Sequence, residues 1–309
     1  MRNRPRVTVL GSLNMDISVT VPRLPAPGAT VLGSAARFTP GGKGANQAVA
    51  AARLGASVHM TGCVGDDDFG RQLLAALREE KVDTGGVRVT DGAPTGLAMI
   101  SVDQAGENII TVAPGANHET GPAEVRAALA QPQNVLVVCA EIRPEAIVAV
   151  LARHRVSILN LAPAPADAAA IVAGGRPDWL VVNENEAGAV LGRPVSGLSD
   201  AAQAAVALID AGARHAVVTA GAHGAALADG PGPAETVQAF RVEAVDTVGA
   251  GDTFVGALAV TLAAGVPAAE AVRAAAAAGA TAATRPGAQA GMPRPADIRA
   301  VTGLTWPVR

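Results

Sequence analysis

The feature that most constrains the fold of this chain is a repeated alternation of short apolar runs with helical patterns. The apolar runs are rich in Val, Leu and Ile, which is typical of strands buried on both faces of a sheet. Repeated strand–helix units predict an α/β fold, with a mostly parallel sheet and helices on both of its faces. The expected strands are 7–10, 58–61, 135–139, 157–161, 179–182 and 216–219, and the expected helices are 45–54, 69–80, 145–153, 186–191, 200–211 and 254–264.

Two segments, 17–38 and 95–112, depart from this alternation. The first has β-like stretches interrupted by prolines, and the second alternates as strand, turn and strand. Together they predict a small β-sheet that projects from the main body as a lid. The alternative is a pair of surface hairpins without a function. Because no low-complexity linker interrupts the chain, we expect residues 1–309 to form a single domain that carries this lid.

Composition excludes several function classes. The net charge is -3 and basic residues are dispersed, so nothing indicates nucleic acid or an acidic membrane as partner. Tyr is absent and aromatic residues make up 2%, which leaves hydrogen bonds and aliphatic walls to hold a ligand. We find neither a signal peptide nor an apolar run of about 18 residues, and therefore expect a cytoplasmic protein. The two cysteines, Cys63 and Cys139, are expected to be reduced thiols.

The segment GAGDTF (249–254) joins a Gly-rich turn to a helical pattern. Backbone N–H groups at a helix start attract anions, and Gly249 and Gly251 let a ligand approach closely. A carboxylate in such a turn is electrostatically unfavourable unless it has a task. Accepting the proton of a hydroxyl that attacks phosphorus is such a task, which makes Asp252 a candidate base. An ordinary helix N-cap is the alternative, and these residues alone leave it open.

The stretch PGGKGANQAVAAARLG (40–55) is a second loop that leads into a helix. It is not a P-loop, because Arg37 stands where GxxxxGK[ST] requires the first Gly and Gly44 follows the lysine. No GxGxxG follows a strand either, so the dinucleotide fingerprint is missing. Asn46 offers donors and acceptors that suit a polyol. A tight turn with a solvated Lys43 is the alternative.

Three further polar segments follow predicted strands, where ligands bind in open α/β sheets. GSLNMD (11–16) places Asn14 and Asp16 on the same side of an extended chain, where they can grip two neighbouring hydroxyls or form an Asx turn. In NENE (183–186), Asn183 and Glu186 are candidates for positioning a metal-bound triphosphate through water, or for capping a helix. VVTAGAHG (217–224) supplies a Gly-containing turn that can meet phosphates.

Taken together, these segments resemble the ribokinase/PfkB family of carbohydrate kinases. The GGKGANQA form of the loop at 41–48 points to the family's ribose kinases rather than to its nucleoside or fructose 6-phosphate kinases. The match runs in order through nearly the whole chain. It is carried by GSLNMD (11–16), PAPGAT (25–30), GGKGANQAVAAARLGA (41–56), GCVGDDDFG (62–70), PTG (94–96), GENIITVAPGAN (106–117), LNLAPA (159–164), NENE (183–186), VVTAGAHG (217–224), VDTVGAGDTF (245–254) and TRPGAQ (284–289).

The resemblance implies a Rossmann-like α/β domain whose β lid also makes a homodimer contact. It implies transfer of the γ-phosphoryl group of ATP to the O5 hydroxyl of D-ribose, with Mg²⁺ and an activating K⁺. By motif matching, Asp252 is the base and Gly249, Ala250 and Gly251 form the anion hole. The other implied contacts are Asn14, Asp16, Gly42, Lys43, Asn46 and Glu141 to the sugar; Asn183, Thr219, Gly221, Gly224 and Gly251 to ATP; Glu186 to Mg²⁺; and Asp246, Val248, Ala282, Arg285, Gly287 and Gly291 to K⁺.

The sequence departs from the family pattern at two places. Gly291 stands where a Ser commonly supplies a cation ligand, and the Ala-rich stretch 273–280 lacks the polar or His residue often found against adenine. Relatives that phosphorylate 2-deoxyribose have nearly the same sugar residues. The alternatives to a ribose kinase are therefore a kinase for 2-deoxyribose, another pentose or a nucleoside, and a catalytically weak sugar-binding sensor.

Overall fold

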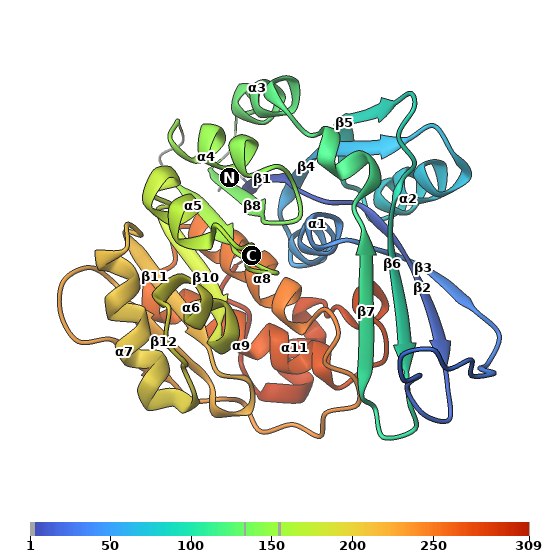
Figure 1. The fold of residues 1–309 in the computed structure, drawn as a ribbon. Coiled ribbons are helices and arrows are strands. Elements are labelled where there is room, and N and C mark those ends of the chain that lie inside the picture. Colours follow the sequence, from blue (N-terminus) through green and yellow to red (C-terminus); the bar gives the residue numbers. More distant parts are fainter. Residues whose placement is uncertain (1–3, 133, 154–155, 309) are drawn as a thin grey trace.

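The computed structural model describes residues 4–132, 134–153 and 156–308. Its centre is a nine-stranded sheet with the order β13-β12-β11-β10-β9-β8-β1-β4-β5 (Figure 1). The seven strands from β11 to β5 in this order are parallel, as the alternation predicts, and β12 and β13 add an antiparallel edge. The strands are β1 (Arg6–Leu10), β4 (Ser57–Gly65), β5 (Asp83–Thr90), β8 (Val135–Cys139), β9 (Ser157–Asn160), β10 (Trp179–Asn183), β11 (His215–Thr219), β12 (Ala225–Ala228) and β13 (Glu235–Val237).

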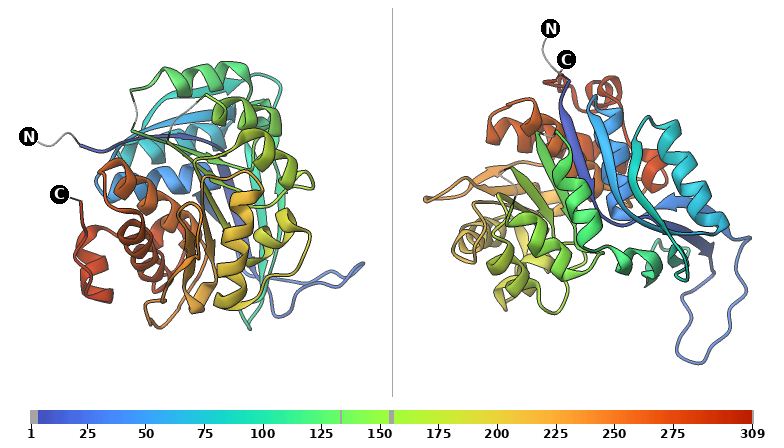
Figure 2. Two further views of the ribbon diagram at one scale, coloured as in Figure 1. Left: turned by 90° about the vertical axis from the view of Figure 1, so that its left-hand side faces the viewer. Right: turned by 90° about the horizontal axis from the view of Figure 1, so that it is seen from above.

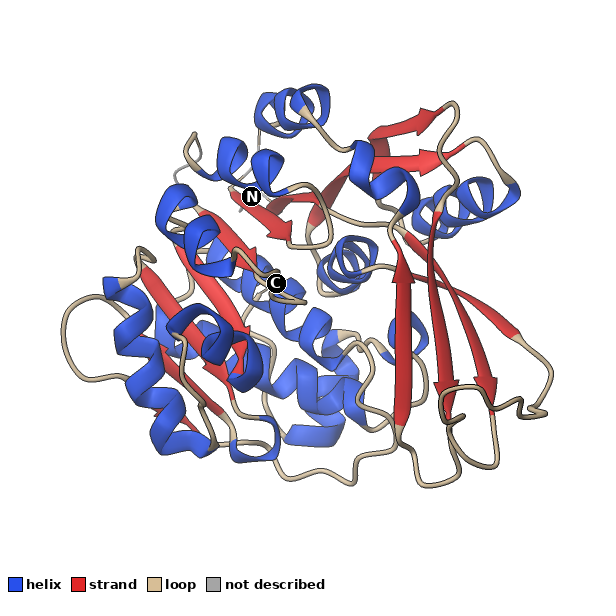
Figure 3. Ribbon diagram, in the orientation of Figure 1, coloured by secondary structure: helices blue, strands red, loops and turns tan. Residues whose placement is uncertain are grey.

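Helices cover both faces of this sheet (Figure 3), because its central strands expose apolar side chains on both sides. One face packs against α1 (Lys43–Arg53), α2 (Asp68–Glu79), α8 (Ala250–Ala263), α9 (Ala268–Ala283) and α11 (Pro295–Thr302). The other packs against α3 (Pro122–Ala130), α4 (Pro144–Leu151), α5 (Ala168–Gly175), α6 (Glu184–Leu191) and α7 (Gly197–Asp210). A short helix, α10 (Ala288–Gly291), follows α9.

The second, four-stranded sheet stands apart from the main sheet on the right of Figure 1. Its order is β3-β2-β6-β7, formed by β2 (Asn14–Thr20), β3 (Arg37–Gly41), β6 (Gly96–Val102) and β7 (Asn108–Ala113). The predicted small sheet is confirmed, but its strands extend beyond the predicted ranges 17–38 and 95–112. Residues 21–36 contain no strand and form the long loop that projects beyond the body in Figure 2. The prolines and glycines of that loop interrupt strand pairing.

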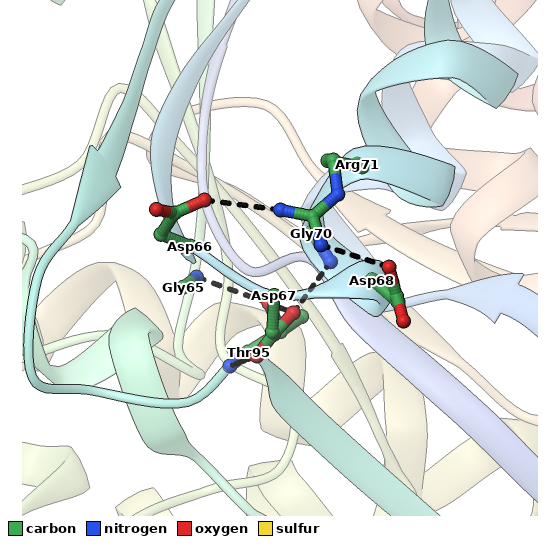
Figure 4. Close-up of polar contacts among 7 residues, drawn as sticks. All are labelled: Gly65, Asp66, Asp67, Asp68, Gly70, Arg71 and Thr95. Atoms are coloured by element: carbon green, nitrogen blue, oxygen red, sulfur yellow. Dashed lines mark hydrogen bonds and ion pairs between the residues drawn. The ribbon is translucent and has the colours of Figure 1, made fainter.

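The start of β6 is tied to the main sheet at the N-terminus of α2 (Figure 4). Asp67 caps α2 by accepting from the Gly70 amide at 2.8 Å, and it accepts from the amide and the hydroxyl of Thr95 at 2.8 and 2.6 Å. The Thr95 hydroxyl in turn accepts from the Gly65 amide at 3.0 Å. One carboxylate thus links the helix after β4 to the entrance of the small sheet.

Several element boundaries differ from the sequence-based prediction. Helix α8 begins at Ala250 rather than Phe254, with Gly249 as its N-cap, so the turn and the first helical turn overlap. Asp252 is therefore not the N-cap, and that alternative interpretation of the GAGDTF segment is wrong. Strands β5, β12 and β13 were not predicted. Within the described ranges, none of the helices is both long enough and apolar enough to span a membrane.

Candidate active site

The predicted polar segments meet at the carboxyl edge of the main sheet. Strand β1 lies between β8 and β4. Later strands are added towards β5 on one side of β1 and towards β11 on the other, and ligands bind at such points where the strand order reverses. Ser12 and Asn14 follow β1, Glu141 follows β8, and Asn160 ends β9. This arrangement follows from parallel pairing, which brings strand ends far apart in sequence to a single edge.

Asp252 lies in the first turn of α8 with only 7% of its surface exposed. Its Oδ2 accepts from Nδ2 of Asn46 at 2.9 Å, and its Oδ1 accepts from Nε2 of Gln47 at 3.0 Å. Both donors lie on α1, which packs directly against α8. One amide group therefore holds each oxygen of the carboxylate. The packing of α1 against α8 fixes the plane of the carboxylate.

The loops that carry the predicted sugar ligands pack tightly on each other. Gly42 has a φ of 88°, and a Cβ at this position would lie 2.5 Å from the backbone nitrogen of Asn14. Only Gly fits such a close approach of two backbones. The Asn14 side chain is held in the same place, because its Oδ1 accepts from Nδ2 of Asn117 at 2.7 Å. The two loops thus form one unit.

Glu141 belongs to the same unit. Its Oε2 accepts from the Ser12 hydroxyl at 2.5 Å and from the Lys43 backbone amide at 3.3 Å. Asp16 lies one residue beyond Met15 in β2, opposite Thr39 of β3. The structure therefore brings together all the residues predicted to hold a sugar: Asn14, Asp16, Gly42, Lys43, Asn46 and Glu141.

The charges of this cluster are strongly coupled. Burial, together with the neighbouring carboxylates of Glu141 and Asp252, raises the pKa of Asp16 to about 7. Burial also raises the pKa of Glu141, although Lys43 and Ser12 oppose this shift. For Lys43, burial alone would lower the pKa, but the surrounding carboxylates outweigh it and the pKa is raised. The free site thus has an excess of acceptor groups around a single buried ammonium.

A cavity of about 450 Å³ opens beside the N-terminus of α8. Its walls are mostly aliphatic and come from α9, the β11–β12 connection and the segment 239–247. Ala276, Gly279, Ala280 and Ala283 form the α9 side, so the Ala-rich stretch noted in the sequence faces the cavity. Four of the five residues predicted to contact ATP line it, namely Thr219, Gly221, Gly224 and Gly251, whereas Asn183 does not.

The predicted anion hole stands between the polar cluster and this cavity. A Cβ at Gly251 would meet no atom within 4 Å, so the backbone there borders open space. The amides of a first helical turn have no intrahelical partner. The Ala250 amide is an exception to the prediction, since it donates to the carbonyl oxygen of Thr247 at 3.2 Å. Of the three predicted residues, Gly251 is the one whose backbone borders open space.

Asn183 and Glu186 form a capping box at the start of α6. The Glu186 amide donates to Asn183 Oδ1 at 2.9 Å, and the Asn183 amide donates to Glu186 Oε2 at 2.8 Å. These two residues therefore cap a helix, which was the alternative to positioning a metal-bound triphosphate. Burial raises the pKa of Glu186, against the opposing effects of the Asn183 amide and Lys43. This carboxylate is therefore coupled electrostatically to the polar cluster as well as capping its helix.

The residues predicted to hold a monovalent cation gather where α9 ends. Asp246 accepts from the amides of Val248 and Gly287 at 3.0 and 2.8 Å. A Cβ at Gly291 would lie 3.2 Å from the carbonyl oxygen of Arg285 and 3.3 Å from that of Ala282. Several backbone carbonyls and one carboxylate thus converge, which is a donor set of the kind that hard cations prefer. In the described ranges, no group of three or more His, Cys, Asp or Glu side chains could hold a metal ion.

Comparison with protein families gives a match over residues 4–295 to the model described as pfkB family carbohydrate kinase. The chain belongs to the pfkB family. This pfkB chain is 37% identical to ribokinase of Schizosaccharomyces pombe over 93% of its length and 94% of the relative's. It is 39% identical to ribokinase of Bacillus subtilis, covering 95% and 97% of the two chains. It is also 33% identical to deoxyribokinase of Salmonella typhi, covering 82% and 84%.

Solved structures of other pfkB-type kinases share the fold. Ribokinase of Thermotoga maritima superposes with a TM-score of 0.86 at 32% identity, covering 96% of this chain and 99% of that one. Ribokinase of Arabidopsis thaliana, complexed with ribose and ATP, has a TM-score of 0.84 at 28% identity and covers 98% and 100%. Phosphofructokinase-2 of Escherichia coli in complex with potassium has a TM-score of 0.79 at 25% identity and covers 97% and 98%.

Sequence reasoning missed the amides around the pfkB chain's Asp252. Gln47, Asn160 and Gln289 were not singled out, although each lies inside a quoted motif. Gln47 donates to Asp252 across 205 positions of sequence, and Gln289 donates to Asn46 across 243. The only local signal for Gln47 was a long polar side chain among the Ala and Val residues of the expected helix 45–54.

Proposed function

We propose that this pfkB family member transfers the γ-phosphoryl group of ATP to the O5 hydroxyl of D-ribose. The observation that carries the proposal is the place of Asp252. Its carboxylate contacts the polar cluster through Asn46, while its neighbour Gly251 lines the aliphatic cavity. A base at the junction between a polyol-binding cluster and a phosphate-binding turn is the arrangement that phosphoryl transfer to a sugar hydroxyl requires.

In this mechanism, the polar cluster orients the sugar. Carboxylates of Asp16 and Glu141 accept from ribose hydroxyls, and Asn14, Asn46 and Lys43 donate to them. Asp252 accepts the O5 proton while O5 attacks the γ-phosphorus in line with the departing ADP oxygen. The amides of Gly249 and Gly251, with Ala250 beside them, stabilise charge on the transferred group. ATP occupies the cavity bounded by Thr219, Gly221 and Gly224, with Asn183 near its phosphates.

Mg²⁺ belongs to this proposal as the partner of the ATP phosphates, whose charge it neutralises. Glu186 is the residue to hold it, through water, because its carboxylate already accepts from Asn183 and can share only its remaining lone pairs. The described residues offer no three-ligand protein cage for this ion. That finding fits an ion bound mainly by phosphates and water.

An activating K⁺ is proposed beside the end of α9. Asp246 and the carbonyls of Val248, Ala282, Arg285 and Gly287 would hold it, and Gly291 has no side chain to add. The bound ion would order the 246–249 and 285–291 segments, which hydrogen-bond to each other through Asp246. The potassium complex of Escherichia coli phosphofructokinase-2 supports a cation site in this fold.

The small sheet is proposed to act as a lid over the sugar and as the contact of a homodimer. Lid closure would exclude water, which competes as phosphoryl acceptor. Exposed apolar side chains support the dimer: Phe38, Met99, Ile109, Ile110 and Val112 are each 40–53% exposed, and Leu32 is 90% exposed. A cytoplasmic location completes the proposal, since ATP is supplied there and both cysteines are free and buried.

The test is an ATP-dependent phosphorylation panel over D-ribose, 2-deoxyribose, arabinose, fructose and nucleosides, each with and without K⁺. We expect the highest kcat/KM for D-ribose and a rise in rate with K⁺. The likeness to deoxyribokinase makes 2-deoxyribose the second candidate. A higher kcat/KM for 2-deoxyribose than for D-ribose would make 2-deoxyribose the preferred substrate. Tight ribose binding without turnover would instead favour a sugar-binding sensor, and no pentose turnover or binding would overturn the proposal.

A further inference from the structure

Gln47 is a fully buried polar side chain in contact with Asp252. Its exposed fraction is 0%, so it cannot reach the solvent. Its Nε2 donates to Asp252 Oδ1 at 3.0 Å and to Asn160 Oδ1 at 2.9 Å. Its Oε1 has no hydrogen-bond partner in the described part of the chain. Burying an unpaired amide oxygen is unfavourable, and a Met or Leu of similar volume would avoid that cost.

The direction of these hydrogen bonds is fixed by the main chain of the sheet. Nδ2 of Asn160 donates to the carbonyl oxygen of Val181 in β10 at 3.2 Å, which turns Asn160 Oδ1 towards Gln47. Gln47 therefore faces two acceptors, Asn160 Oδ1 and Asp252 Oδ1, and must present its Nε2 to them. A rigid backbone group thereby sets the orientation of the amide that holds the carboxylate.

A second chain of hydrogen bonds holds the other oxygen of the carboxylate. Asn46 donates to Asp252 Oδ2, and Gln289 Nε2 donates to Asn46 Oδ1 at 3.0 Å. Helix α10, which carries Gln289, is fixed by Arg53. The Arg53 Nη1 donates to the carbonyls of Gln289 and Met292 at 2.5 and 2.9 Å. With one lone pair of Oδ1 and one hydrogen of Nδ2 engaged in this way, Asn46 keeps one acceptor site and one N–H for a sugar.

We propose that Gln47 is a positioning residue for Asp252, which holds the base carboxylate in the plane in which it receives the O5 proton, and that Gln289 supports the opposite oxygen through Asn46. The inference rests on the proposed role of Asp252 as base. It explains why an amide with an unpaired oxygen occupies a fully buried position. Each carboxylate oxygen has two acceptor sites, so one remains for the hydroxyl proton while both amide hydrogen bonds persist.

The main test is Gln47→Met, which keeps the side-chain volume and removes the donor. We expect kcat to fall by about 10- to 100-fold, because small displacements of a reacting group have effects of this size. The Kd for ribose by calorimetry and the KM for ATP should stay within about threefold, since Gln47 contacts neither. Gln289→Met should show a smaller fall in kcat together with weaker ribose binding, because it acts through Asn46.

The matched control is Thr261→Val, which removes a buried hydroxyl from the same helix as Asp252. Thr261 bonds only to backbone carbonyls of its own helix at 2.9 Å and does not contact Asp252. A similar loss of thermal stability in Gln47→Met and Thr261→Val, with loss of kcat only in the first, supports positioning. Equal loss of kcat in both would overturn it and indicate a general effect of buried polar groups.

Gln47→Glu tests the inference through the pH dependence of kcat, which a purely structural role of Gln47 would leave unchanged. While the introduced carboxyl is protonated, its single O–H can donate to Asp252 but not also to Asn160, whereas its ionised form repels Asp252. The ratio of wild-type to variant kcat should therefore rise with pH, by up to about tenfold per pH unit once the carboxyl ionises. Asp16, Lys43, Glu141 and Glu186 are the other titratable groups around Asp252, and they are common to both proteins, so the ratio isolates the substituted position.

A ratio that does not change with pH would contradict the inference even if Gln47→Met fails to fold. Near-wild-type kcat in Gln47→Met would also contradict it and leave the proposed function standing. By contrast, absence of phosphorylation by the wild-type protein would contradict the proposed function itself. The two failures are thus distinguished in one experiment, with wild type as the reference.

Discussion

The two halves of the candidate site use different chemistry. The half predicted to bind the sugar is dense in carboxylates and amides, several of them held by a defined partner, as Glu141 is by Ser12 and Asp252 by Gln47. The half predicted to bind the nucleotide is an aliphatic cavity in which Ala and Gly of α9 form one wall. Specificity for a ligand is therefore expected to come from side chains on one side and from backbone and shape on the other.

This difference follows from what each half has to recognise. A small polyol has no apolar face, and a site must pair its hydroxyls with fixed donors and acceptors. A flat purine can be held by apolar walls, and phosphates by backbone amides. The chain contains no Tyr, so the walls of the nucleotide half depend on aliphatic side chains, with Phe240 and Phe254 as the exceptions.

The largest expected effect lies at the junction of the two halves. Asp252→Asn removes the proton acceptor and should lower kcat by about a thousandfold, within the range of about 10²–10⁴ that a general base contributes. A larger fall would mean that the orientation of the sugar is lost as well. The Kd for ribose should change little, because Asn is nearly isosteric with Asp. Stopped-flow or coupled assays give kcat, and calorimetry gives Kd. Asp210→Asn, at the exposed end of α7, is the control; near-normal kcat in Asp252→Asn would refute the assignment.

The aliphatic half should respond to volume alone. Ala280→Leu places a larger side chain in the cavity and should raise the KM for ATP by about 10- to 100-fold. Ribose binding measured without nucleotide should stay unchanged. An equal loss of ribose affinity would show that the two halves are not separable, and an unchanged KM would place ATP elsewhere.

The polar half should respond to pH. Asp16 has its pKa raised to about 7, so it takes up a proton as the pH falls from about 8 to about 6, and ribose affinity should weaken in that interval. The effect on stability has the opposite sign. A carboxyl whose folded pKa exceeds its unfolded value of 3.8 destabilises the fold above the folded pKa, and protonation removes that burden as the pH falls.

Asp16→Asn should therefore raise Tm more at a pH of about 8.5 than at a pH of about 5.5, while weakening ribose binding at both. Scanning fluorimetry at the two pH values, without sugar, measures the difference. Asp103→Asn, in the turn between β6 and β7, provides a carboxylate of the same sheet outside the polar cluster. An equal gain in Tm at the two pH values would contradict the raised pKa.

The smallest expected effect concerns the link between the small sheet and the main sheet. Asp67→Ala removes the cap of α2 and both hydrogen bonds from Thr95, which should lower stability by about 1–2 kcal/mol. The KM for ribose should rise a few-fold, because the strand that faces the sugar residues is less firmly placed. The KM for ATP should not change. A larger effect on ATP than on ribose would argue against a lid on the sugar side.

How much of this could be predicted from the sequence differs between the fold and the site. The six buried parallel strands were predicted because apolar runs such as 135–139 are a local signal. Strand β5 was missed because its sequence, DTGGVRVT, contains two glycines and no continuous apolar run. The short Ala-rich β12 resembles a helix by propensity, and only its pairing with β11 and β13 makes it a strand.

The motif residues of the site were predicted, but their connections were not. Asn46 and Asp252 carry recognisable patterns, whereas the amide chain through Gln47, Asn160 and Gln289 depends on contacts between residues more than 100 positions apart. Local spacing carries no information on such contacts. The hydrogen bond from the Ala250 amide to Thr247 is local, and it was missed because it depends on where α8 begins.

The most direct test of the central claim is the identity of the product formed from D-ribose, ATP and Mg²⁺. Phosphorus and proton NMR on the purified product would locate the new phosphoester. The account predicts ribose 5-phosphate formed in equal amount with ADP, and its loss in Asp252→Asn. Phosphorylation at another hydroxyl, or ADP released without a sugar phosphate, would contradict it.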